Sequence, residues 1–261
     1  MMTVDFRFAV GINSVQSRAA LRETAWRCED SGFDVLNIPD HLGAPAPFPV
    51  LTAAAQATSK IRVGTYVMNA AFYSPALLAR DAAEVHTLSD GRLDLGLGAG
   101  YVREEFEAAE IPFPSAGARV THLEHVAKYL RRHHPEIPLL IAGSGERVLT
   151  VAARHADIVG VTGTERIELV RAAAEGRPVV LDLAITAAPS GDSGLPDLKM
   201  PRRYAPGLSD AEILALPGVL SGTPRESADK LRALRDEHGL TSFSVQLKDS
   251  AYFAKVIAEL R

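Results

Sequence analysis

The stretch LSDGRLDLGLGAGYVREEF, residues 88–106, places residue types that could bind a small molecule and act on it close together. Its glycine run, 96–100, ends an alternating apolar pattern that predicts a strand. Glycines let a ligand approach the backbone closely because they carry no side chain. Glu104 and Glu105 follow within one helical turn, where a carboxylate can exchange a proton with a ligand or simply be stabilised by the helix dipole. This stretch therefore predicts a ligand site at a strand end.

The spacing of the glycines separates two kinds of site. A dinucleotide-binding fingerprint, G-x-G-x-x-G, belongs on the first strand–helix turn, with an acid at the end of the second strand. Here the glycines lie on the fourth expected strand, and Gly96, Gly98 and Gly100 do not complete that spacing. The sequence therefore favours a glycine-lined strand end at the mouth of a different α/β fold.

The elements that must position these residues alternate between strands and helices along the chain. Eight strand-like segments, each followed by helical material, lie near residues 6, 35, 61, 93, 138, 157, 179 and 242. Such alternation with short connections predicts βαβ units and a parallel sheet. Eight units in 261 residues favour a closed (β/α)8 TIM barrel, with residues 1–261 as one domain, over an open doubly wound sheet.

Three segments can be described in more detail. Thr223-Pro224-Arg225-Glu226 forms a capping box that begins a helix. Residues 186–209, rich in proline and glycine, are expected to form a long loop after the seventh strand, at the catalytic face of a barrel. The helix expected from Pro75 to Gly91 should turn one apolar face inward. That face comprises Leu77, Leu78, Ala82, Val85 and Leu88.

Composition limits the partners. The net charge of −4, with both signs interspersed, gives no basic stripe for nucleic acid. The single cysteine, Cys28, excludes an internal disulfide and a cysteine-rich zinc site. His122 and His125 lie on an expected outer helix, where we predict a solvated face and no metal site. No apolar run approaches the roughly 18 residues that span a membrane, and MMTVDFRFAVGI lacks a signal-peptide pattern. We therefore expect a soluble, cytoplasmic protein.

Several segments resemble the bacterial luciferase-like flavin- and deazaflavin-dependent oxidoreductases, the luciferase-like monooxygenase family. They include RFAVGI, IPDHLG, LSDGRLDLGLGAGYVREEF and GTPRES, and they occur in order over residues 6–185 and 222–247. The sequence is most similar to actinobacterial members that use coenzyme F-420. The resemblance implies a TIM barrel, in agreement with the strand count.

The resemblance also implies a cofactor site at the strand ends. Asp40 and His41 correspond to a pair at the end of the second strand, where the Asp helps to position the cofactor and the His lies beside its redox ring. Tyr66-Val67 corresponds to a non-proline cis peptide that supports this ring. Gly143-Ser144-Gly145 opens a helix and would present backbone N–H groups to a cofactor phosphate.

The fourth strand end would complete this site. Gly98 and Gly100 would line it, and Glu104 or Glu105 would protonate the substrate or bind a cofactor hydroxyl, with the choice between the two acids left open. His41 is a candidate proton donor because imidazole exchanges protons near neutral pH. Plainer alternatives remain, since a strand-end His can bond a loop carbonyl and a glycine-rich turn can serve only a tight connection.

The implied function is hydride transfer between coenzyme F-420, a deazaflavin, and a small organic substrate. An FMN-dependent monooxygenase would use the same barrel mouth and remains an alternative. A non-catalytic flavin- or partner-binding protein is the third, because the chain lacks a segment that relatives usually carry between the helix at 119–132 and the strand at 138. This shortening predicts a more open pocket, or one that another element closes. A homodimer is expected from the family, and the substrate does not follow from the sequence.

Overall fold

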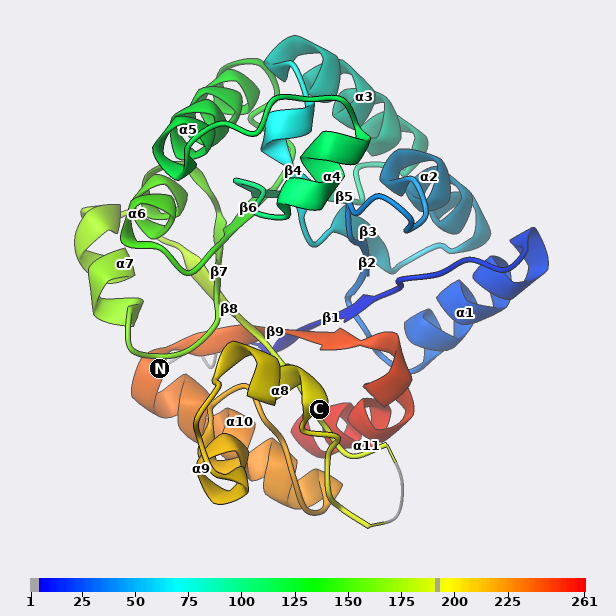
Figure 1. The fold of residues 1–261 in the computed structure, drawn as a ribbon. Coiled ribbons are helices and arrows are strands. Elements are labelled where there is room, and N and C mark those ends of the chain that lie inside the picture. Colours follow the sequence, from blue (N-terminus) through cyan, green and yellow to red (C-terminus); the bar gives the residue numbers. More distant parts are fainter. Residues whose placement is uncertain (1–4, 191–192) are drawn as a thin grey trace.

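A computed structural model describes residues 5–190 and 193–261, and in it parallel strands close into a barrel that helices surround (Figure 1). The strands follow the order β3-β2-β1-β9-β8-β7-β6-β5-β4, and β3 also pairs with β5, which closes the barrel. The predicted (β/α)8 TIM barrel is confirmed, with a strand at each of the eight expected places. The strands are β1 (Arg7–Gly11), β2 (Val35–Ile38), β3 (Arg62–Thr65), β4 (Met68–Asn69), β5 (Leu93–Gly98), β6 (Leu139–Ala142), β7 (Ile158–Val161), β8 (Val180–Ala184) and β9 (Leu240–Gln246).

Helices follow the strands, and most of them surround the outside of the barrel. They are α1 (Arg18–Asp30), α2 (Pro47–Ala57), α3 (Pro75–Leu88), α4 (Arg103–Ala108), α5 (Ala116–His133), α6 (Glu146–His155), α7 (Ile167–Ala174), α8 (Lys199–Tyr204), α9 (Asp210–Ala215), α10 (Pro224–His238) and α11 (Ser250–Leu260), with 3-10 turns η1 (Ala70–Phe72) and η2 (Leu247–Asp249). The capping box predicted at Thr223 and Glu226 is present at the start of α10. In the part of the chain that the structure describes, no helix is long and apolar enough to cross a membrane.

The third barrel strand is interrupted, so the structure has nine strand segments where the sequence predicts eight. Tyr66 and Val67 separate β3 from β4, and the peptide bond between them is cis, as the resemblance implied. On one side β3 pairs with β2, and on the other β3 and β4 pair in turn with β5.

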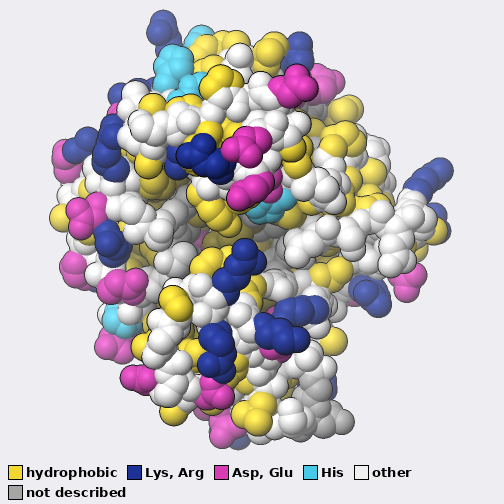
Figure 2. Space-filling view, in the orientation of Figure 1, with side chains coloured by type: hydrophobic (Ala, Val, Ile, Leu, Met, Phe, Trp, Pro, Cys, Tyr) yellow, Lys and Arg dark blue, Asp and Glu magenta, His cyan; other side chains and the backbone are white. Residues whose placement is uncertain are grey.

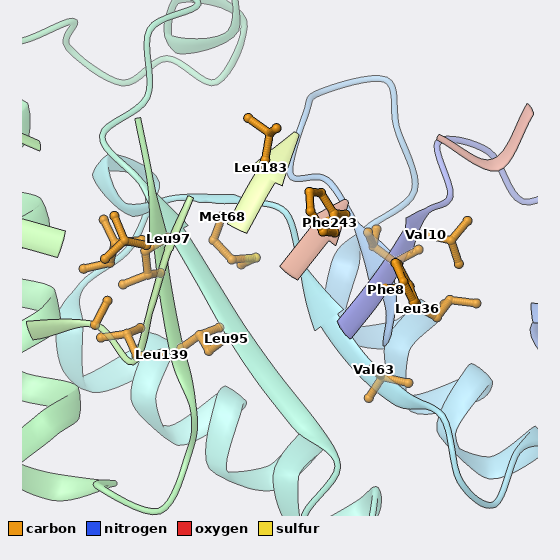
Figure 3. Packing of buried hydrophobic residues seen from close by; sticks show 14 of the residues in the cluster. Phe8, Val10, Leu36, Val63, Met68, Leu95, Leu97, Leu139, Leu183 and Phe243 are labelled. Carbon is orange, nitrogen blue, oxygen red and sulfur yellow. The ribbon is translucent and has the colours of Figure 1, made fainter. Parts of the chain in front are cut away.

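The hydrophobic core lies mainly between the barrel and the helices. Figure 3 shows the large apolar side chains of several strands gathered together, among them Phe8, Leu36 and Phe243. The ring of Phe8 meets that of Phe253 in α11 at a centroid distance of 5.5 Å, so this side of β1 faces the helices. Side chains alternate along a strand, which turns Arg7 and Ser242, the neighbours of these aromatics, toward the barrel interior.

The face predicted for α3 is only partly right. Leu78, Ala82 and Val85 are buried, but Leu77 is 52% exposed and Leu88 is 43% exposed. Successive helical residues point about 100° apart, which carries Leu77 away from the buried stripe through Leu78, and Leu88 is the last residue of the helix. The apolar pattern therefore overestimated the width of the buried face.

The segment predicted as a long loop, 186–209, contains a helix. It includes α8, and it packs with α9 through a small apolar cluster of its own; residues 191–192 of the predicted loop lie outside the described residues. Gln246, the last residue of β9, contacts Met200 in α8. The segment therefore lies at the carboxyl-terminal ends of the strands and contains a helix. The buried members of this cluster are Ala187, Ile213 and Val219.

Candidate active site

His41 and Glu105 meet at the mouth of the barrel, where the carboxyl-terminal ends of the strands open. His41 follows β2, and Glu105 lies in the first turn of α4, after β5. The His41 Nδ1 and Glu105 Oε1 atoms are 2.7 Å apart, and the side chains are 46% and 15% exposed. Glu104, the other candidate acid, is exposed. The structure thus brings together one of the two predicted acids and the predicted histidine.

An aromatic cluster fixes the helix that carries Glu105. Phe106 in α4 is fully buried, and its ring lies 5.0 Å from that of Phe72 and 4.9 Å from that of Phe113. Neighbouring residues of a helix point in different directions, so burying Phe106 on one side leaves Glu105 free to face the strand ends. Figure 1 shows α4 lying across these ends.

Asp40, just after β2, is bonded to the end of β4. Its Oδ2 accepts a hydrogen bond of 3.0 Å from the backbone N–H of Asn69. Burial raises the pKa of Asp40, while hydrogen bonds from Asn69 and from the Tyr73 hydroxyl act in the opposite direction. Burial and the neighbouring Asp40 raise the pKa of Tyr73, which therefore stays protonated and donates a hydrogen bond to Asp40. Asp40 thus orients the chain next to His41, and sequence reasoning missed Tyr73 as its partner.

The glycines of β5, and Gly100 just after it, are needed for packing. A Cβ atom on Gly96 would lie 2.0 Å from the Thr65 carbonyl oxygen, and one on Gly98 would lie 2.7 Å from a Val67 methyl group. Gly100 has φ of +73°, and a Cβ there would lie 2.1 Å from the Asn69 side chain. The interrupted third strand therefore lies directly against Gly96, Gly98 and Gly100, a surface without side chains that we call the glycine wall.

The turn Gly143-Ser144-Gly145 leads from β6 into α6, as predicted. Gly145 is the N-cap residue and offers no side-chain cap, and a Cβ on it would meet nothing within 4 Å. The first N–H groups of a helix have no partner within the helix, so this end is open to a small anion. Glu146 is 72% exposed, and its carboxylate lies 3.4 Å from Arg166.

His122 does not lie on a solvated face, so the prediction of such a face is wrong for this residue. Its Nε2 lies 3.1 Å from the carbonyl oxygen of Ala70 and 3.0 Å from that of Tyr73, which ties α5 to η1. His125, one turn later, is exposed. Over residues 5–190 and 193–261, no group of three or more His, Cys, Asp or Glu residues could hold a metal ion.

A polar cluster that the sequence did not reveal lies inside the barrel. Asp182 is 1% exposed and accepts hydrogen bonds from Ser242 Oγ at 2.6 Å and Ser244 Oγ at 3.0 Å. The Tyr66 hydroxyl also bonds to Asp182. A single acid within the apolar run PVVLDLAI was the available signal, because a buried carboxylate needs partners.

The surface around the mouth carries charges of opposite sign. Figure 2 shows acidic side chains over α4 and basic side chains over α8, on either side of a hollow. On α8, Arg202 forms an ion pair with Asp210 of α9.

The chain is similar to proteins of one family. A family model described as luciferase-like monooxygenase matches residues 2–131. An F-420-dependent glucose-6-phosphate dehydrogenase of Amycolatopsis mediterranei is 28% identical over 182 residues, which cover 57% of this chain and 55% of that protein. A 5,10-methylenetetrahydromethanopterin reductase of Archaeoglobus fulgidus is 42% identical over 149 residues, 49% of this chain and 45% of that protein. The chain thus spans about half of the length of these curated relatives.

Solved structures share the whole fold. The coenzyme F-420 dependent tetrahydromethanopterin reductase from Methanopyrus kandleri superimposes with a TM-score of 0.78 at 18% identity, over 99% of this chain and 100% of that one. An F-420-dependent secondary alcohol dehydrogenase, in complex with an F-420-acetone adduct, has a TM-score of 0.79 at 17% identity, over 99% and 100% of the two chains. At these identities the likeness shows a common barrel.

Proposed function

Because this chain belongs to the luciferase-like monooxygenase family, we propose that it is an oxidoreductase that transfers a hydride between coenzyme F-420 and a small organic substrate. Similar proteins named as F-420-dependent support this choice of cofactor. The observation that carries the proposal is the contact between His41 and Glu105, 2.7 Å apart at the barrel mouth beside the glycine wall of β5.

The residues at the mouth fit a flat ring with a phosphate-bearing tail. Val67 packs against Gly98 and the Asn69 side chain packs against Gly100, so Tyr66-Val67 forms the surface that would meet the ring. The open N-terminus of α6, at Gly143-Ser144-Gly145, offers backbone N–H groups and a positive dipole end to a phosphate. Bound there, F-420 would supply the hydride chemistry, which no side chain of the protein can supply.

The protein would supply the proton and the orientation. A proton must accompany the hydride, and His41 is our candidate to hold it at an imidazole nitrogen, because it lies at the mouth and remains partly open to solvent. Glu105, in contact with Nδ1, would orient the ring of His41 and leave Nε2 directed elsewhere. Asp40 would hold the backbone beside His41 in place.

Titration of the purified protein with F-420 and, separately, with FMN tests the cofactor. We expect F-420 to bind, with a change in its absorbance and fluorescence, and we expect turnover with a substrate from a panel that includes glucose 6-phosphate and secondary alcohols. His41→Ala should lower turnover about 100-fold, whereas His125→Ala, an exposed control on α5, should leave it unchanged. Failure to bind F-420 would refute the proposal.

An FMN-dependent monooxygenase is the second candidate, because the matching family model is itself described by monooxygenase activity. Binding of FMN instead of F-420, with oxygen consumption by the reduced complex, would establish it. Binding of either cofactor without turnover on any substrate of the panel would favour the non-catalytic alternative.

We further propose that the protein is a homodimer, as the family resemblance implies, and that it acts in the cytoplasm, as expected from its sequence. Two large apolar side chains, Trp26 and Leu88, are 46% and 43% exposed, and both residues contact the carboxyl-terminal end of α2. Light scattering coupled to size-exclusion chromatography would show the expected doubled mass, and a monomer would exclude it.

A further inference from the structure

The barrel interior contains two polar clusters. In one, Asp94 forms ion pairs with Arg7 and Arg62. In the other, Asp182 is bonded to two serines and to Tyr66. Barrel interiors are more often filled by branched apolar side chains, so each cluster needs a reason. Only the second one includes a residue of the candidate site.

Tyr66 reaches across the barrel. The residue lies between β3 and β4, yet its hydroxyl meets Asp182 in β8 and Ser244 in β9. A Cβ placed on Gly160 in β7 would lie 3.4 Å from this hydroxyl. In the strand order, β9 is three strands and β8 four strands away from β3, so the phenol connects opposite walls.

At the Asp182 end of this connection, three hydroxyl groups donate hydrogen bonds to the carboxyl group. Asp182 accepts hydrogen bonds from Ser242 at 2.6 Å, from Ser244 at 3.0 Å and from Tyr66, and these bonds oppose the burial that raises the pKa of Asp182. Burial raises the pKa of Tyr66, and the neighbouring Asp182 raises it further. Tyr66 therefore keeps its proton and directs it to Asp182, away from the mouth, which makes it unsuited to protonate a substrate.

The near end of the connection is the surface beside the glycine wall. Tyr66 precedes Val67, whose methyl group occupies the space that a side chain at Gly98 would need. Fixing the phenol at Asp182 therefore fixes where the backbone of Tyr66 and Val67 stands relative to β5.

We propose that Tyr66 and Asp182 are positioning residues. They would hold the backbone of Tyr66 and Val67 at the position, relative to β5, where it supports the flat ring of the cofactor. This inference rests on the proposed function, since it assigns a role within the same site. It predicts that loss of the Tyr66 hydroxyl changes how the cofactor is held, beyond any loss of stability.

The test compares Tyr66→Phe and Asp182→Asn with Ser242→Ala in titrations with F-420 and FMN. Ser242 bonds to Asp182 from the same cluster, so its variant is a matched control that leaves the Tyr66 hydroxyl and its partner in place. We expect Tyr66→Phe to raise the cofactor Kd about tenfold and to shift the absorbance maximum of the bound ring. Ser242→Ala should change Kd less than about twofold, even if it lowers Tm.

The outcomes separate this inference from the proposed function. Wild-type protein that binds neither cofactor would overturn both. Wild-type binding together with unchanged affinity and spectrum in Tyr66→Phe, or an equal loss in Ser242→Ala, would overturn the inference alone. Circular dichroism checks the fold of each variant. If Tyr66→Phe does not fold, Asp182→Asn and Ser244→Ala replace it in the test. A wild-type cofactor Kd in both of these variants would overturn the inference.

Discussion

Replacing Gly96 by alanine should destabilise the protein strongly, even though the change adds one methyl group. That methyl would lie 2.0 Å from the Thr65 carbonyl oxygen, whereas carbon and oxygen normally approach to about 3.3 Å. One backbone would therefore have to move by about 1.3 Å. The move is opposed because the Thr65 hydroxyl bonds to both the N–H and the carbonyl oxygen of Gly96, each at 2.8 Å.

The loss in free energy of unfolding can be estimated from other substitutions that add a methyl group to a packed core. Extra methyl groups in packed cores usually cost about 1–3 kcal/mol. Because two hydrogen bonds join Gly96 to the Thr65 hydroxyl, we place Gly96→Ala at the upper end, about 3 kcal/mol. In a chain of this size that corresponds to a fall in Tm of about 6–12 °C.

Gly11→Ala is the matched control, because Gly11 also lies in a barrel strand. A Cβ there would lie 3.6 Å from the Val245 carbonyl oxygen, an ordinary contact, so Tm should stay within about 2 °C of wild type. Calorimetry without cofactor measures both variants. Equal Tm values for Gly96→Ala and Gly11→Ala would refute the argument that packing alone requires glycine at position 96.

Two further predictions concern acids. Glu105→Gln should lower turnover at least tenfold, because it weakens the contact with His41, while Glu104→Gln should leave turnover within about twofold; equal effects in the F-420 absorbance assay would contradict this assignment. Glu29→Gln should cost about 1–2 kcal/mol at neutral pH, because the Glu29 carboxylate accepts backbone N–H groups from residues 59–61. Although burial opposes them, these bonds lower the pKa of Glu29 in the folded protein, so its contribution is present above the unfolded value of about 4.3 and is lost as pH falls through the folded pKa. Urea titrations at pH 7 and pH 3 should therefore show the difference from wild type shrinking with acid, and a constant difference would refute this linkage.

The barrel could be predicted from sequence because its signal is repeated. Each strand buried on both faces reads as an apolar run, and each is followed by a helix, so an error in one element does not alter the fold. The break between β3 and β4 could be placed only through the family resemblance, since Tyr66 and Val67 are ordinary strand residues.

Side-chain contacts within the site were harder to predict from the sequence. The sequence offered both Glu104 and Glu105, and only the packing of Phe106 decides which of them meets His41. Asp182 stands in an apolar run that predicts a buried strand, but its partners are Tyr66 and Ser244, far away in the chain. Such pairings depend on the closed geometry of the barrel, which periodicity does not encode.

The small apolar cluster beneath α8 and α9 has a consequence for how this protein can diversify. Because Ala187, Ile213 and Val219 pack with one another apart from the main core, changes on the outer surface of this segment need not be transmitted to the strands. The side of the mouth opposite α4 can therefore accept new shapes and charges through substitution while the side that carries His41 and Glu105 keeps its arrangement. Selection for a new substrate would act most readily there.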